Sequence, residues 1–108
     1  MKIEKVLFML PYAMELSSRR MGIRTLHLSE LVVLYVVKNS LIPPGKCAIQ
    51  RHLQKVKHPA NYVTIHKACD WLVEVGFLER SGTKYSLSHL GKDYLQSIRR
   101  YMIHQRLK

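Results

Sequence analysis

The stretch from Asn61 to Leu87 constrains the fold more than any other part of this 108-residue chain. Its first half has apolar residues at the i, i+3, i+4, i+7 spacing of a helix with one buried face, namely Ile65, Ala68, Cys69, Leu72 and Val75. Asn61 can cap this helix, because its side chain accepts from an unpaired backbone N–H of the first turn. Gly76 can end it, because glycine adopts the left-handed conformation freely. The pattern predicts a helix over residues 61–75.

Two short runs with partial period-two alternation follow, Phe77–Arg80 and Lys84–Leu87. The three residues between them, Ser81–Thr83, include a glycine and suit a tight turn. We therefore expect a small antiparallel hairpin directly after the helix.

The outward face of the predicted helix is uneven in charge. Val63 and Lys67 lie opposite Ile65, whereas Asp70 and Glu74 come only towards the C-terminal end. Phosphates repel acids, so only the first two turns suit a DNA groove, and recognition helices contact base edges with their N-terminal residues. A solvated face of mixed charge is the alternative interpretation.

The whole chain is strongly basic, with 18 Lys and Arg against 7 Asp and Glu, a net charge of +11 and a pI near 10.0. No acid occurs from Leu31 to Cys69. Such a charge favours nucleic acid or an anionic membrane surface as partner. The apolar runs are too short to span a membrane, and no secretory signal is recognised. Cys47 and Cys69 are the two cysteines, which we interpret as reduced thiols, so we expect a cytoplasmic protein.

Residues 1–24 are predicted to form an N-terminal helical extension, in which Pro11 either kinks one helix or begins a second. Thr25–Leu28 suits a short strand, and Ser29 suits the cap of the next helix. Leu31–Val37 is apolar almost all round, which favours a buried helix, although its β-branched residues also suit a strand.

Residues 46–56 have apolar side chains at helical spacing, and residues 57–60 form a turn that contains a proline. Ser88 is placed to cap a last helix over residues 88–108, about 30 Å long. A single domain with its core over residues 29–87 is expected at this length. The expected core residues are Ile49, Leu53, Ile65, Leu72 and Phe77.

Two motifs in this order resemble the winged helix-turn-helix transcriptional regulators, particularly the MarR and PadR-like groups. Leu72–Arg80, LVEVGFLER, is similar to the end of the family's recognition helix. Tyr85–Gly91, YSLSHLG, is similar to the run that closes the wing and opens the next helix. The resemblance covers about Ser29 to Tyr94. It implies an α+β, mostly α fold: a winged helix-turn-helix with a short β-hairpin wing and extra N- and C-terminal helices. The short wing lacks the Asp-Arg pair typical of the MarR group.

The resemblance implies a small transcriptional regulator that binds double-stranded DNA sequence-specifically, with helix 61–75 in the major groove. The family's base-reading positions fall on Val63, Thr64, His66 and Lys67. The wing tip falls on Ser81–Thr83. The expected DNA-binding residues are Asn61, Tyr62, Val63, Thr64, His66, Lys67, Arg51, Lys55, Lys57, Arg80, Thr83 and Lys84.

Other function classes receive less support from the sequence. The six histidines form no four-ligand metal spacing, and no catalytic set or phosphate loop occurs, so we expect no metal, no cofactor and no enzymatic activity. Two alternatives stay open. One is an accessory winged helix of replication or recombination that binds single-stranded or structured nucleic acid, with Tyr62 as a stacking residue. The other is a winged helix used for protein–protein contacts.

Apolar residues at both ends of the chain predict a homodimer built from the N- and C-terminal helices. Their apolar surface is larger than a winged-helix core can cover, and exposed apolar patches of several hundred Å² usually mark interfaces. They are Val6, Leu7, Leu10, Met14, Ile98, Tyr101, Met102 and Leu107. In the alternative, the first segment folds over its own domain and leaves a monomer.

Overall fold

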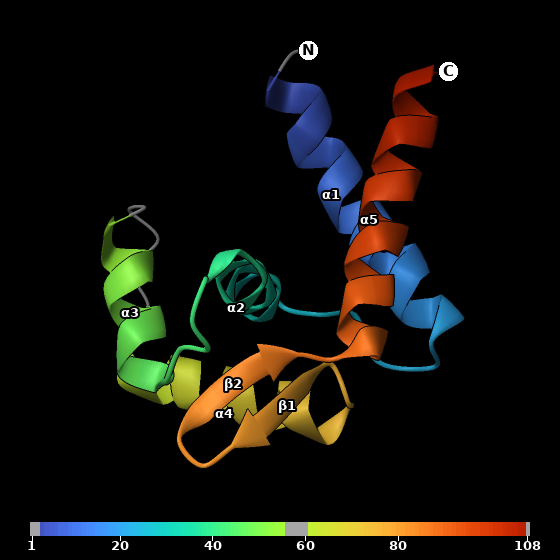
Figure 1. The fold of residues 1–108 in the computed structure, drawn as a ribbon. Coiled ribbons are helices and arrows are strands. Elements are labelled where there is room, and N and C mark those ends of the chain that lie inside the picture. Colours follow the sequence, from blue (N-terminus) through green and yellow to red (C-terminus); the bar gives the residue numbers. More distant parts are fainter. Residues whose placement is uncertain (1–2, 56–60, 108) are drawn as a thin grey trace. The chain divides into compact units, whose positions relative to one another are not determined.

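The computed structural model describes the backbone of residues 3–55 and 61–107, and the side chains of residues 9–55 and 61–103. The described elements are α1 (Ile3–Arg20), α2 (Leu28–Asn39), α3 (Lys46–Lys55), α4 (Tyr62–Glu74), β1 (Leu78–Ser81), β2 (Lys84–Leu87) and α5 (His89–Leu107) (Figure 1). The expected α+β, mostly helical class is confirmed. None of the helices, within the described residues, is long and apolar enough to cross a membrane.

The chain forms two compact units. Unit 1 comprises Met1–Leu26 and Lys92–Lys108, and unit 2 comprises His27–Gly91.

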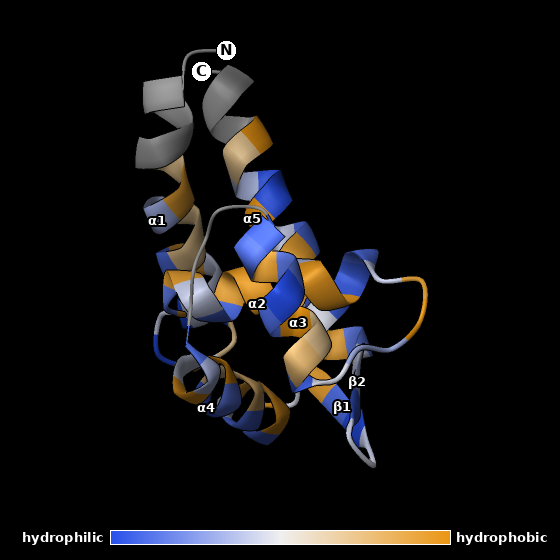
Figure 2. Cartoon of the chain, turned by 90° about the vertical axis from the view of Figure 1, so that its left-hand side faces the viewer, coloured by the Kyte–Doolittle hydropathy of each residue, from blue (hydrophilic) through white to orange (hydrophobic). Residues whose placement is uncertain are grey.

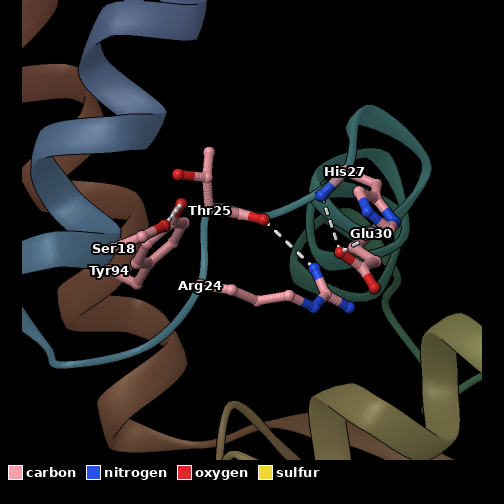
Figure 3. Close-up of polar contacts among 6 residues, drawn as sticks. All are labelled: Ser18, Arg24, Thr25, His27, Glu30 and Tyr94. Atoms are coloured by element: carbon pink, nitrogen blue, oxygen red, sulfur yellow. Dashed lines mark hydrogen bonds and ion pairs between the residues drawn. The ribbon is translucent and has the colours of Figure 1, made fainter.

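In unit 1, α1 and α5 lie side by side (Figures 1 and 2). Pro11 lies inside α1, so this segment is one helix and not two. Buried hydroxyl groups link the two helices. Ser17 Oγ lies 2.9 Å from Ser97 Oγ. Ser18 Oγ lies 3.0 Å from the Tyr94 hydroxyl, as Figure 3 shows. The buried apolar side chains are Ala13, Met14, Leu26, Tyr94, Leu95 and Ile98.

The start of α2 differs from the expectation in two ways. Thr25–Leu28 is not a strand, and the sheet of the described residues contains β1 and β2 only. The N-cap is His27 and not Ser29. Glu30 decides this, because its carboxylate reaches back three residues and accepts from the His27 backbone N–H at 2.6 Å (Figure 3).

The apolar run Leu31–Val37 lies in α2, so the helical alternative holds. Five of its seven side chains are buried. α2 packs against α3, α4 and β2 and therefore supplies the centre of unit 2.

The helix expected over residues 61–75 is confirmed as α4. Asn61 Oδ1 accepts from the Thr64 backbone N–H at 2.8 Å, as expected for an N-cap. At the other end, the Phe77 N–H donates to Leu72 O at 2.8 Å and the Gly76 N–H to Val73 O at 3.0 Å. These two bonds, with Gly76 at φ +86°, form a Schellman motif that ends the helix.

β1 and β2 pair as an antiparallel hairpin, with Leu78 opposite Leu87 and Ser81 opposite Lys84. Ser81 is therefore the last residue of β1, and the turn consists of Gly82 and Thr83 alone, one residue shorter than expected. The chain before α3 lies against β2, because the Tyr85 N–H donates to Pro44 O at 2.9 Å. The five expected core residues are all at most 1% exposed.

Ser88 caps α5 as expected, since its Oγ accepts from the Gly91 N–H at 3.0 Å. The same hydroxyl donates to Gly76 O, which ties the start of α5 to the end of α4 within unit 2. The turn expected over residues 57–60, and with it Lys57, lies outside the described residues, as do the side chains of Val6, Leu7 and Leu107.

Candidate nucleic-acid interface

The exposed face of the first two turns of α4 is the centre of the candidate interface. Tyr62 is 47% and Val63 57% exposed, Lys67 is exposed, and Thr64 is half-buried. The opposite face is held in the core by Ile65 and its helical neighbours. The helix has no acid in its first turn, so the positive end of its dipole is not offset there.

A three-residue network lies beside this face and joins α3 to α4. The Nζ of Lys46, the first residue of α3, is hydrogen-bonded to His66 Nδ1. It also lies 3.6 Å from Asp70 Oδ1, and His66 Nε2 lies 3.2 Å from Asp70 Oδ2. The Lys46 side chain is only 14% exposed, whereas His66 and Asp70 are about half exposed.

The charge of Lys46 assigns the tautomer of His66. Burial by itself lowers the pKa of Lys46, but the Tyr85 hydroxyl and the Asp70 carboxylate outweigh it and raise the pKa above its usual value. Lys46 is therefore an ammonium group with donors only, so His66 Nδ1 accepts from it, while Nε2 lies 3.2 Å from Asp70 Oδ2. His66 Nδ1 is thus engaged within the protein, and Nε2 lies close to the Asp70 carboxylate.

Tyr62 covers one side of the same histidine. The Tyr62 and His66 rings are stacked, with their centroids 6.1 Å apart and their planes 21° apart. Two half-exposed rings therefore form one aromatic surface at the N-terminal end of α4.

The hairpin turn gathers a second group of expected site residues. Arg80, Thr83 and Lys84 are all exposed, and the Arg80 Nε donates to Gly82 O at 2.8 Å. This bond holds the guanidinium group against the turn. Arg51 and Lys55 are exposed on α3.

Cys69 lies behind the exposed face of α4 and is fully buried, as expected. Burial raises the pKa of its thiol to about 11, with Lys46 opposing and Asp70 adding to the shift. Such a thiol is a core side chain and not a nucleophile. No group of three potential metal ligands occurs among the described residues.

Lys46 is the residue that the sequence interpretation missed. It was visible as a cation in the acid-free run, but nothing local to it indicates a contact with His66, 20 residues away. The excess of positive charge is also not confined to the unit that contains α4. Unit 1 contains ten Lys and Arg against three Asp and Glu, and unit 2 contains eight against four.

Comparisons with models of known protein families, with curated proteins and with solved structures give no match.

Proposed function

We propose that this protein is a small winged-helix transcriptional regulator that binds double-stranded DNA sequence-specifically, with α4 in the major groove. The observation that carries the proposal is the exposed, acid-free N-terminal face of a capped α4, whose other face is fixed in the core. The order of α2, α3, α4 and a hairpin in unit 2 supports the winged-helix assignment. Recognition helices contact bases with this end of the helix.

The exposed residues receive distinct roles in this proposal. Val63 contacts a thymine methyl group, and Lys67 contacts guanine. Asp70, the acid nearest to this end, has its charge offset by Lys46. His66 Nδ1 is bonded to Lys46 and its ring stacks on Tyr62, so we assign His66 to holding Tyr62 in place and not to base reading.

The first experiment measures duplex binding as a function of salt. Six phosphate contacts would give a log–log slope of about −5. Lys84→Ala should remove one contact and make the slope shallower by about 0.9 without changing the preferred sequence. A flat salt response would contradict the proposal.

The second experiment separates reading from positioning. We expect Val63→Ala and Lys67→Ala to relax preference at one or two base pairs each, by roughly 1–3 kcal/mol of discrimination. Lys84→Ala is the matched control, because it should weaken all duplexes about equally. If the preferred sequence selected from random duplexes is identical in all three variants, α4 is not the reading helix.

The stacked Tyr62–His66 pair favours one second candidate, binding to single-stranded nucleic acid by base stacking. Tyr62→Phe keeps the ring and Tyr62→Leu removes it. This candidate would be favoured over the regulator if the chain binds single strands more tightly than duplexes, and if Tyr62→Phe keeps single-strand binding while Tyr62→Leu loses it.

A homodimer through α1 and α5 completes the proposal. Met14 and Ile98, two of the residues that suggested it, are buried within the single chain. Tyr12 and Ile103 remain exposed on the same two helices and are the proposed contacts. A two-fold dimer would bind half-sites about 34 Å apart. A monomeric mass by light scattering at micromolar concentration would remove the dimer but leave the DNA proposal.

A further inference from the structure

The loop between α2 and α3 presents two adjacent apolar side chains to solvent. Leu41 is fully exposed and Ile42 is 78% exposed, and the neighbouring Pro43 is exposed as well. In Figure 2 the outermost part of this loop is hydrophobic and projects from unit 2. Single exposed apolar residues are common, but a projecting pair indicates a contact surface.

The base of this loop is attached to the β1–β2 hairpin near its turn. Pro44 O accepts from the Tyr85 N–H at 2.9 Å. A Cβ on Gly45 would lie 3.1 Å from Thr83 O, and 4.0 Å from Lys84 Nζ. Ile42 is three residues before Gly45, so at most about 11 Å of chain separates it from this contact. The apolar pair and the hairpin turn therefore belong to one edge of unit 2.

The charges along this edge favour an anionic partner. Lys38 is exposed in the last turn of α2, just before the loop, and exposed Lys84 lies next to Gly45 at the loop's end. No acid occurs in the sequence from Leu31 to Cys69. Arg80 is held against the hairpin turn by its bond to Gly82 O. A surface with apolar side chains near cations fits a nucleic-acid groove, which phosphates line.

We propose that Leu41 and Ile42 enter the DNA minor groove beside the hairpin and wedge between base steps, so that binding bends the duplex. This inference rests on the proposed duplex binding. Minor-groove proteins insert leucine, isoleucine or proline in this manner and kink DNA by about 20–90°. The hairpin turn has only two residues, Gly82 and Thr83, and therefore offers little surface of its own to a groove.

The test measures the bend and the affinity separately, with the full-length chain and its selected duplex. Energy transfer between dyes at the two duplex ends reports the bend, and 2-aminopurine in the bound site reports unstacking. Leu41→Ser with Ile42→Ser should restore the end-to-end distance of free DNA and abolish the 2-aminopurine increase. We expect binding to weaken by no more than about tenfold, since phosphate contacts supply most of the affinity. Leu28→Ser is the matched control, because Leu28 is an exposed leucine at the start of α2, and it should leave both signals unchanged.

Each other result has a defined meaning. Tight duplex binding by the wild-type chain without a bend overturns the wedge and leaves the proposed function intact. No duplex binding at low salt overturns both. Binding to vesicles that contain phosphatidylserine, lost in the double variant while the DNA bend persists, assigns the loop to membranes and overturns the wedge.

Discussion

Gly91 offers a sharp test of the packing in unit 2, because its α-carbon lies against a fixed carbonyl group. A Cβ added there would lie 2.3 Å from Phe77 O and 2.8 Å from Leu87 Cδ1. Ordinary contact begins at 3.4 Å, so the first pair would have to separate by about 1.1 Å. Phe77 cannot easily move, since its carbonyl accepts from the Ser88 N–H at 3.0 Å and its N–H donates to Leu72 O at 2.8 Å.

We expect Gly91→Ala to destabilise the chain by about 2 kcal/mol. Overpacking of this severity costs about 3 kcal/mol. The higher helix propensity of alanine than of glycine offsets at most about 1 kcal/mol of this cost. For a chain of this length the melting temperature should fall by about 9 °C. Urea unfolding followed by circular dichroism at fixed protein concentration measures the difference.

Gly82→Ala is the control for this prediction. Gly82 has φ +61°, but a Cβ there would have no atom within 4 Å. Only the left-handed backbone is strained, which costs about 1–2 kcal/mol. If Gly91→Ala unfolds at the wild-type urea concentration, or costs less than Gly82→Ala, the close approach to Phe77 does not exist.

Ser17→Ala and Ser97→Ala should each lower the free energy of unfolding by about 1–3 kcal/mol, because each leaves the partner's buried hydroxyl unpaired. The double variant should lower it by less than the sum of the two, and additive values in urea unfolding would refute the contact. The pKa of the Cys69 thiol is about 11 in the folded chain and an ordinary 9.0 in the unfolded chain. Between these two pH values the folded chain binds more protons than the unfolded chain, so the free energy of unfolding should fall as pH rises from 9 to 11. Cys69→Ala should remove this contribution to the pH dependence of stability. At pH 8, Ellman's reagent should label the exposed Cys47 rapidly and the buried Cys69 only after unfolding. Asn61→Ala should cost about 1 kcal/mol by removing the cap of α4, and Asn61→Asp should restore it in the absence of DNA.

The sequence alone determined the elements whose signals are local. α4 was predictable from its cap, its apolar spacing and the glycine that ends it, because all of these act within about four residues along the chain. The hairpin was predictable in the same way from Gly82 and its flanking runs, although β1 begins and ends one residue later than expected, at Leu78 and Ser81.

Tertiary structure decided the features that depend on separate elements. Periodicity could not distinguish helix from strand over Leu31–Val37, because a run buried all round has no exposed face to reveal its period. The contact of Lys46 with His66 exists only once α3 packs on α4. Gly91 matched a family motif in the sequence, but its physical reason, the carbonyl group of Phe77 14 residues away, appears only in the folded chain. Side-chain contacts at such separations are fixed by packing geometry, which local propensity does not encode.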